Sequence, residues 1–333
     1  MCRNKEKKVS IIMPAYNAEK YIEEAIYSVL AQTHKEWELI IIDDCSSDNT
    51  EQIVLKYVSK DTRIRYLKNP VNLGVSKSRN LGIKKSKNDW IAFLDSDDCW
   101  ENDKLEKQLK LFEQHPEGKL FFTGSGFINE EGNKSSYVLQ TPEKITFRKL
   151  LKQNVISCSS VLAEKRLLLE HPMEGDFLHE DFVVWLKILQ EKKYAFSVDE
   201  PLLLYRLSQQ SKSSNKKKAA QMTWWAYRTI GLNIVESLYY FIWYTCKNRN
   251  GAFHETAYSY KKQPDHGGDP GGGHRLLLSD PGGGGIRHPC APSVRPGGAF
   301  YFQVHRRIYL WDRGVHDRGG GRQLCVHLSV FCH

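Results

Sequence analysis

Short apolar runs alternate with segments of helical periodicity over the first hundred residues. The apolar runs, rich in strand-forming residues, cover residues 9–13, 37–42, 63–67 and 90–94. After the first run, apolar residues recur three and four positions apart from Tyr21 to Leu30, with Asn17 as the predicted N-cap, and a second helix is predicted over 51–58. Strands that alternate with helices predict an α/β fold with a parallel sheet and right-handed crossovers.

Polar clusters stand next to these apolar runs and in the connections between them. They are Pro14-Ala15-Tyr16-Asn17, Asp43-Asp44, Arg79-Asn80 and the run from Asp95 to Asp98. Open parallel sheets bind ligands at the carboxyl ends of their strands. We therefore expect all four clusters at one edge of the sheet, where they would form a single site.

The run Asp95-Ser96-Asp97-Asp98 carries the most specific chemistry. Crowded carboxylates repel one another unless a cation lies between them, and Mg²⁺ or Mn²⁺ shared with the phosphates of a substrate is the natural occupant. The alternative is a solvated acidic turn that caps a helix beginning near Trp100. The other polar clusters at the same edge favour the metal.

Five stretches of the chain together resemble the family 2 glycosyltransferases, which have the GT-A fold. They are SIIMPAYNAEKYIEEAIYSVLAQT, WELIIIDDCSSDNT, GVSKSRNLGI, FLDSDD and, later, His179-Glu180-Asp181 with the helix after it. In that order they span residues 8 to about 210. The resemblance implies a Rossmann-like, mostly parallel sheet flanked by helices, and an inverting transferase that uses a nucleotide sugar.

The resemblance also implies roles for individual residues. The donor-binding set is Pro14, Ala15, Tyr16, Asn17, Asp44, Arg79, Asp95 and Asp97. Tyr16 is expected near the base, Asp44 accepts from the ring N–H of the base or else caps a loop, and Arg79 faces the diphosphate, whose oxygens suit a guanidinium fork. Asp97 and Asp98 would serve the metal, with Asp95 assisting them or ordering the loop.

A general base is required because the acceptor hydroxyl loses a proton as it attacks. Asp181 resembles the base of the inverting family members; the alternative is a carboxylate that stabilises the N-terminus of a helix. Glu180 would orient the site or contact the acceptor. Trp185, one turn further along, is an acceptor-side candidate, although a core position is the favoured interpretation. Ser157-Cys158-Ser159-Ser160 is interpreted as structural rather than sugar-binding.

The chain divides into four predicted parts. Residues 1–110 form the nucleotide-sugar-binding half, residues 111–222 the acceptor half with a hairpin over 119–139, 223–250 an aromatic C-terminal helix, and 251–333 a tail. The aromatic segment, flanked by lysines, is typical either of a helix in a membrane interface or of a helix packed on the catalytic domain. The sequence leaves these two alternatives open.

Composition gives no indication of nucleic-acid binding, of a cysteine or histidine metal site, or of a membrane-spanning segment. The net charge of +9 comes without any nucleic-acid recognition motif, and the cysteines and histidines show no metal-ligand or disulfide spacing. No apolar run is long enough to span a bilayer, and the charged residues 1–8 do not resemble a signal peptide. These features predict a cytoplasmic protein, at the inner face of the membrane if the aromatic segment binds lipid.

The tail differs from the rest of the chain. Residues 1–250 contain 29 Lys and 9 Arg, whereas residues 251–333 contain 2 Lys and 8 Arg together with 16 of the 24 glycines. We interpret it as a shifted reading frame or a fused foreign segment, the alternative being a flexible Gly-rich appendage.

The resemblance implies transfer of a sugar from a UDP- or dTDP-sugar to a glycan or lipid-linked acceptor during surface polysaccharide synthesis. One alternative is a catalytically idle nucleotide-sugar-binding or scaffold protein. The other is a sugar nucleotidyltransferase, which usually needs a Gly-rich loop with Lys or Arg after the first strand. Residues 14–17 are not such a loop.

Overall fold

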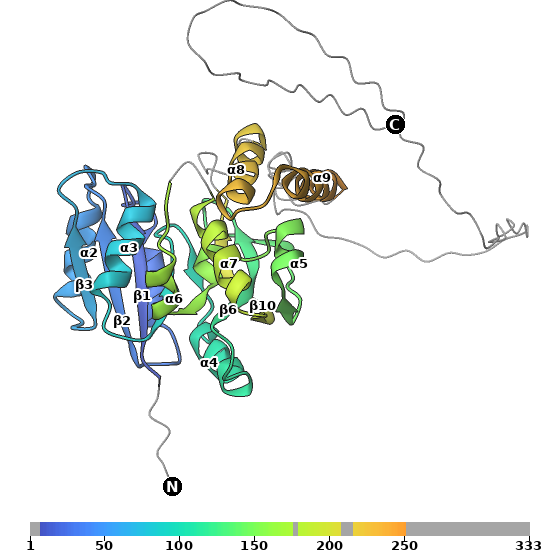
Figure 1. Cartoon of the computed structure of the whole chain (residues 1–333). Coiled ribbons are helices and arrows are strands. Elements are labelled where there is room, and N and C mark those ends of the chain that lie inside the picture. The colour runs from blue at the N-terminus through green and yellow to red at the C-terminus, as the bar shows by residue number, and fades with distance from the viewer. Residues whose placement is uncertain (1–6, 176–178, 208–215, 251–333) are drawn as a thin grey trace, which may run out of the picture. The chain divides into compact units, whose positions relative to one another are not determined.

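A single 10-stranded sheet organises the protein in the computed structural model, which describes residues 7–175, 179–207 and 216–250 (Figure 1). The strand order is β3-β2-β1-β4-β9-β6-β10-β5, with β7 paired to β6 and β8 paired to β10. Helices lie against both faces of this sheet (Figure 1). The predicted α/β fold class is confirmed.

The first half of the sheet is parallel, as its sequence pattern predicts. Its strands are β1 (Val9–Ala15), β2 (Trp37–Asp43), β3 (Ile64–Lys68) and β4 (Trp90–Phe93), connected by α1 (Ile22–Leu30), α2 (Thr50–Val58) and α3 (Val75–Lys85). Successive residues of β1 enter opposite cores, Ile11 on one face of the sheet and Ile12 on the other. Both faces are covered, which explains why the strands are continuous apolar runs in the sequence.

The start of α1 differs from the prediction. Asn17 does not cap it; Tyr21 occupies the N-cap position, and Ile22 is the first residue of the helix. Asn17 instead has a φ of 47° and accepts a hydrogen bond from the backbone N–H of Ser47. Its side chain therefore joins the loops after β1 and β2, and the helix begins once the chain has left that contact.

The second half of the chain extends the same sheet. Its strands are β5 (Cys99–Trp100), β6 (Leu120–Ile128), β7 (Lys134–Leu139), β8 (Lys144–Ile145), β9 (Leu162–Glu164) and β10 (Ala195–Arg206). Its helices are α4 (Lys104–Gln114), α5 (Phe147–Lys152), α6 (Lys165–Glu170) and α7 (Glu180–Glu191), with a 3-10 turn at Cys158–Ser160. The predicted hairpin is confirmed as β6 and β7, and β9 joins β4 to β6, so the two halves share one sheet.

The aromatic segment forms two helices rather than one. They are α8 (Lys216–Thr229) and α9 (Ile234–Asn250). Gly231, with a φ of 86°, ends the first helix because few other residues adopt that conformation without strain. The packed face of α8 carries Tyr227, whose ring is fully buried and whose hydroxyl donates to the Leu151 carbonyl at 2.6 Å.

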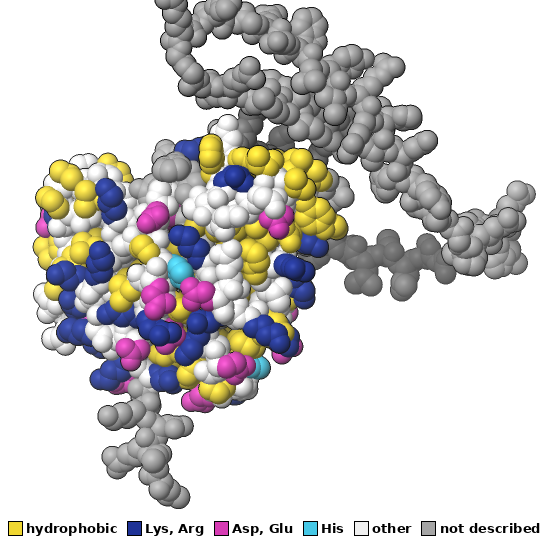
Figure 2. All heavy atoms as spheres, in the orientation of Figure 1, with side chains coloured by type: hydrophobic (Ala, Val, Ile, Leu, Met, Phe, Trp, Pro, Cys, Tyr) yellow, Lys and Arg dark blue, Asp and Glu magenta, His cyan; other side chains and the backbone are white. Residues whose placement is uncertain are grey.

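The outward faces of α8 and α9 are apolar. Figure 2 shows hydrophobic side chains gathered over these two helices. The exposed members are Trp225, Ile234, Val235, Tyr239, Ile242 and Trp243, which we call the α8–α9 surface. Within the described ranges no helix is long and apolar enough to cross a membrane. The tail over 251–333 lies outside the described residues, and our interpretation of it stays a prediction.

Candidate functional site

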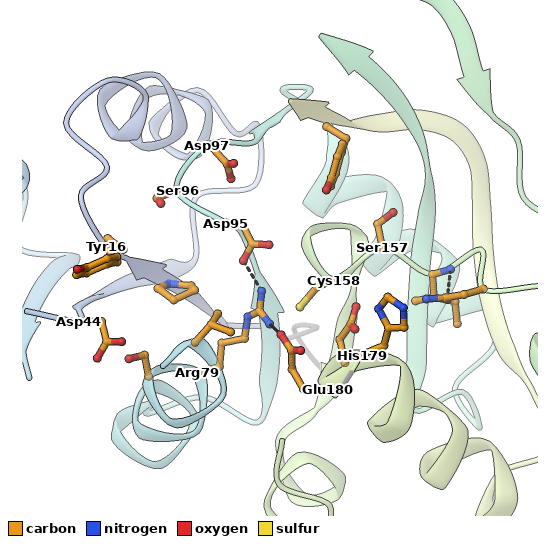
Figure 3. Close-up of a pocket in the computed structure, with 18 of the residues that line it drawn as sticks. Tyr16, Asp44, Arg79, Asp95, Ser96, Asp97, Ser157, Cys158, His179 and Glu180 are labelled. Carbon is orange, nitrogen blue, oxygen red and sulfur yellow. Dashed lines mark hydrogen bonds and ion pairs between the residues drawn. The ribbon is translucent and has the colours of Figure 1, made fainter. Parts of the chain in front are cut away.

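A cavity of about 620 Å³ opens at the edge of the sheet where β1, β2 and β4 end (Figure 3). It is lined by Pro14, Ala15, Tyr16, Asp44, Val75, Ser78, Arg79, Asp95, Ser96, Asp97, Phe127, Leu139, Asn154, Ile156, Ser157, Cys158, His179, Glu180, Asp181, Tyr205, Leu207 and Met222. The four polar clusters predicted to converge do converge here. Asn17 and Trp185 are not among the lining residues.

Asp44 organises one end of the cavity. Its buried carboxylate accepts hydrogen bonds from the Asn69 side chain at 2.7 Å and from the backbone N–H groups of Leu73 and Gly74 at 2.9 and 2.7 Å. These contacts hold the loop that leads into α3, as the loop-capping alternative predicts. The residue also lines the cavity beside Tyr16, which is half exposed (Figure 3). The loop-holding role of Asp44 is thus observed, and its contact with a base stays a prediction.

Arg79 joins the acidic loop to the start of α7, two motifs that are far apart in the sequence. Its side chain is buried, with Nη2 2.6 Å from the Asp95 carboxylate and Nη1 3.0 Å from that of Glu180 (Figure 3). Its Nε is buried without a hydrogen-bond partner among the described residues. The guanidinium fork is therefore engaged by carboxylates, and Arg79 fixes the acidic loop relative to the start of α7.

The three carboxylates of the acidic loop differ in direction. Asp95 and Asp97 line the cavity, whereas Asp98 is buried behind it and accepts from the backbone N–H of Arg206 at 3.0 Å. Burial, together with the charge of Asp95, raises the pKa of the Asp97 carboxyl to about 6. Burial and then the charges of Asp97 and Asp95 raise the pKa of Asp98 well above its usual range. Asp98 thus lies behind the loop while Asp95 and Asp97 face the cavity, and the metal role of Asp98 stays a prediction.

The residues that remain fit a divalent cation shared with a substrate. Among the described residues no three carboxylate, imidazole or thiolate groups form a preformed metal cage. Mg²⁺ and Mn²⁺ bound with nucleotides commonly use one or two protein carboxylates, and phosphate oxygens complete the shell. Asp97 with Asp95 is such a partial set. The pKa of Asp97 is raised mainly by burial and then by the charge of Asp95, and a cation bound beside it would favour the ionised carboxylate.

The start of α7 forms the opposite wall. His179, Glu180 and Asp181 all line the cavity, and Asp181 is only partly buried. One carboxylate oxygen of Asp181 accepts from the backbone N–H of Phe182 at 2.8 Å. Asp181 therefore contacts the first turn of the helix, as one alternative predicts, and it also lines the cavity; its role as a general base stays a prediction.

Trp185 has no place in the site. Its side chain is fully buried in the core and packs against Phe93, with ring centroids 6.1 Å apart. The acceptor-side role is wrong for this residue, and the core interpretation is confirmed. Trp185 lies on the face of α7 that packs into the core, and most residues of this helix are buried.

Several lining residues were not predicted from the sequence. Ser157 and Cys158, interpreted as structural, line the cavity, and Ser159 accepts from the backbone N–H of Asp95 at 3.0 Å. The apolar end of the cavity includes Phe127 and Tyr205, which come from strands β6 and β10. The sequence predicts the first of these strands, as part of the hairpin, but not the second. No local pattern indicates that the ends of the two strands approach the acidic loop.

Comparisons with known proteins agree with this geometry. Residues 10–166 match the family model described as Glycosyl transferase family 2. TuaG of Bacillus subtilis (strain 168), a glycosyltransferase named for teichuronic acid biosynthesis, is 38% identical over 237 residues, which cover 71% of this chain and 94% of TuaG. WfgD of Escherichia coli, named as a UDP-Glc:alpha-D-GlcNAc-diphosphoundecaprenol beta-1,3-glucosyltransferase, is 39% identical over 238 residues, covering 71% of this chain and 91% of WfgD.

Solved structures share the fold at low identity. S. aureus TarS 1–349 in complex with UDP-GlcNAc superposes with a TM-score of 0.58 at 20% identity, covering 77% of this chain and 76% of that one. The mannosyltransferase PcManGT from Pyrobaculum calidifontis, in complex with GDP-Man and Mn2+, gives 0.56 at 14% identity, covering 78% and 79%. TuaG and WfgD are more than a third identical to this chain along nearly their whole length, and the sheet matches the solved structures. The chain therefore belongs to the family 2 glycosyltransferases and has the GT-A fold.

Proposed function

We propose that the protein transfers a sugar from a nucleoside-diphosphate sugar to an acceptor hydroxyl with inversion, assisted by Mn²⁺ or Mg²⁺. The observation that carries the proposal is the shared cavity: Asp44 at one end, Asp95 and Asp97 in the middle, and Asp181 on the opposite wall. The cavity therefore offers three environments in order: one end for the nucleoside, the middle for the diphosphate, and the opposite wall for the attacking hydroxyl.

The leaving group is a nucleoside diphosphate, on which negative charge develops as the glycosidic bond breaks. Asp97 with Asp95 would hold the divalent cation, which neutralises that charge when bound. Tyr16 and Asp44 hold the base end of the donor. Arg79 keeps Asp95 and Glu180 in place, since it bonds both carboxylates from a buried position.

Asp181 accepts the proton of the acceptor hydroxyl. A carboxylate on the wall facing the donor can take that proton as the oxygen attacks the anomeric carbon, and a single displacement inverts its configuration. Glu180 orients this wall through its ion pair with Arg79. Its buried position leaves proton transfer to the more exposed Asp181.

The donor and acceptor are proposed from the relatives. TarS has been solved with UDP and with UDP-GlcNAc, and the name of WfgD gives a UDP-sugar donor and a diphosphoundecaprenol-linked acceptor. We propose a UDP- or dTDP-sugar donor and a glycan or lipid-linked acceptor, in surface polysaccharide synthesis at the inner face of the cell membrane.

The α8–α9 surface supports the membrane part of this proposal. Cations border it: Lys152 lies with its Nζ 4.7 Å from the Trp243 ring centroid, and Arg148 lies beside Val235 and Tyr239 in a shallow groove. Exposed tryptophan and tyrosine next to cations favour the interface of an anionic bilayer. Met222 of α8 also lines the cavity, so the same helix reaches both the surface and the site.

The test is an Asp181→Asn variant of the full chain. It keeps the shape of the side chain but cannot take a proton, so turnover of the donor should fall by about a hundredfold or more while donor binding remains. Turnover is followed as nucleoside diphosphate release with Mn²⁺, and EDTA should abolish it. Asp103→Asn, at a partly exposed carboxylate that does not line the cavity, is the matched control.

Turnover of Asp181→Asn equal to that of the control would remove the base assignment. A wild-type protein that binds nucleotide but turns over no donor with any acceptor would favour the idle binding protein. Diphosphate release from a nucleoside triphosphate and a sugar phosphate would favour the nucleotidyltransferase.

A further inference from the structure

Arg206, the last residue of β10, is the most extensively bonded buried cation near the cavity. Its side chain is fully buried. Nε donates to the Asp97 carbonyl at 2.8 Å, Nη1 to the Asn129 carbonyl at 3.1 Å, and Nη2 lies 2.5 Å from the Glu24 carboxylate. The guanidinium plane also lies 4.3 Å from the ring centroid of Tyr21. One side chain thus joins α1, the acidic loop and the β6–β7 turn.

Arg206 holds the acidic loop at two successive residues. The side chain bonds the carbonyl of Asp97, and the backbone N–H donates to the carboxylate of Asp98 at 3.0 Å. These two contacts are on the side of the loop away from the cavity. They fix the loop in the direction that turns Asp95 and Asp97 toward the substrate, because the chain between the anchored atoms has little freedom left.

Because β10 is pleated, the neighbours of Arg206 contact the cavity while Arg206 itself contacts the acidic loop. Side chains alternate between the two faces of a strand. Tyr205 and Leu207 line the cavity, whereas Arg206 between them points behind the acidic loop. The position of the apolar wall and the position of the loop are therefore set by the same three residues.

We propose that Arg206 is a positioning residue for the metal and donor diphosphate, acting through its bonds to the backbone of Asp97 and to Asn129 and through its backbone bond to Asp98. The proposal rests on the proposed function of the same cavity. It goes beyond that function by assigning donor affinity to a residue that does not line the cavity.

The geometry favours arginine specifically. The planar fork reaches a loop carbonyl, a turn carbonyl and a carboxylate in three directions at once, and a lysine ammonium on a flexible stem cannot hold all three in fixed geometry. Replacing a group that orients a metal ligand by a hydrogen bond commonly lowers the metal affinity 10- to 100-fold. Glu24 is half exposed, so its replacement should leave the fold intact.

The experiment measures Mn²⁺ and nucleotide binding by thermal shift in Arg206→Lys, Glu24→Gln and a control, Arg65→Lys. Arg65 likewise bonds a carboxylate and a carbonyl, those of Glu38 and Lys85, at the opposite end of the sheet. We expect Arg206→Lys to raise the Mn²⁺ concentration for half-maximal stabilisation by UDP about tenfold. Glu24→Gln should raise it about two- to threefold, because it weakens only the bond to Nη2 and leaves the bonds of Nε and Nη1 in place.

Kinetics separate positioning from general destabilisation. In Arg206→Lys the donor KM should rise about tenfold while kcat at saturating Mn²⁺ stays within about threefold, because Asp181 is untouched. Mn²⁺ and donor parameters equal to those of Arg65→Lys, in both Arg206→Lys and Glu24→Gln, would overturn the proposal. If Arg206→Lys does not fold, the Glu24→Gln result alone decides. A wild-type chain that UDP does not stabilise with Mn²⁺ would overturn the proposed function as well.

Discussion

Three carboxylates within four positions lie in three different environments. Asp95 is paired with Arg79, Asp97 faces the cavity, and Asp98 is held from behind by the backbone of Arg206. The motif is therefore not a uniform acidic patch. Arg79 compensates the charge of Asp95, and burial with the neighbouring charges raises the pKa of Asp98. Asp97 faces the cavity, where a cation bound with the substrate would supply positive charge.

This arrangement predicts a stability cost at Asp97. Burial and the charge of Asp95 raise its pKa from 3.8 to about 6. A raised pKa means that the stabilising protonated form is present below about pH 4 and is lost as the pH rises through about 6. At neutral pH without metal, Asp97→Asn should therefore raise the Tm by about 2–6 °C.

The measurement is thermal unfolding in EDTA at pH 7.5 and at pH 4, with Asp103→Asn alongside. The gain of Asp97→Asn over wild type should shrink or vanish at pH 4, where the wild-type carboxyl is protonated. The same variant should lose Mn²⁺-dependent stabilisation by UDP. A lower Tm than wild type at pH 7.5 would contradict this explanation of the loop.

At the scale of elements, the sequence was sufficient to predict a strand or helix wherever that element has its own hydrophobic periodicity. The apolar runs of β1, β2 and β4 and the hairpin over 119–139 follow from the sequence because each run exceeds three residues and is bounded by polar ones. The two-residue strands β5 and β8 carry no such pattern. They form because β10 offers its unpaired edge, a contact made far along the chain.

The same distinction applies to the site. Asp44, Asp95 and Asp181 could be predicted because each follows a recognisable motif. Arg206 could not, since a single arginine at the end of a strand has no local signature and its partners lie up to 182 residues away. Trp185 was recognisable as a core residue by the spacing of α7 alone.

The tight packing of α3 against the sheet predicts that a larger side chain at Gly82 destabilises the protein. A Cβ on Gly82 would lie 2.5 Å from Ile12 Cγ2 and 2.7 Å from Ile42 Cδ1, inside the core. Gly82→Ala should cost about 1–3 kcal/mol of stability by overpacking. It should also raise the donor KM, because α3 carries Ser78 and Arg79 into the cavity.

The control for this prediction is Gly231→Ala between α8 and α9. Its φ of 86° makes alanine strained, but no atom lies within 4 Å of the added Cβ. We expect a comparable loss of Tm with an unchanged donor KM. An unchanged Tm in Gly82→Ala would show that α3 has more freedom to shift than the contacts indicate.

At the scale of the whole molecule, the site gathers residues from 14 to 222 because one sheet runs through the chain. The C-terminal helices extend this unit in two ways. Tyr227 anchors α8 to α5, and Met222 lines the cavity. The opposite faces of α8 and α9 carry the exposed α8–α9 surface. The packed-helix interpretation is thus confirmed for the inner face, and membrane binding by the outer face stays a proposal.

The last prediction concerns the division of the chain at residue 250. The described residues of the core, the cavity and the α8–α9 surface all precede the tail, and TuaG is matched over 94% of its length by 71% of this chain. A chain ending at Asn250 should therefore keep the Tm within about 2 °C, bind UDP with Mn²⁺ as the full chain does, and sediment equally with vesicles containing anionic lipid.

A second truncation, ending before Lys216, supplies the contrast. It removes Met222 from the cavity and uncovers the surface that Ala226 and Tyr227 bury, so it should lower the Tm by several degrees and abolish vesicle sedimentation. Loss of folding or of UDP binding in the chain ending at Asn250 would show instead that residues 251–333 belong to the catalytic unit. In that case the change from lysine to arginine would mark neither a frame shift nor a foreign segment.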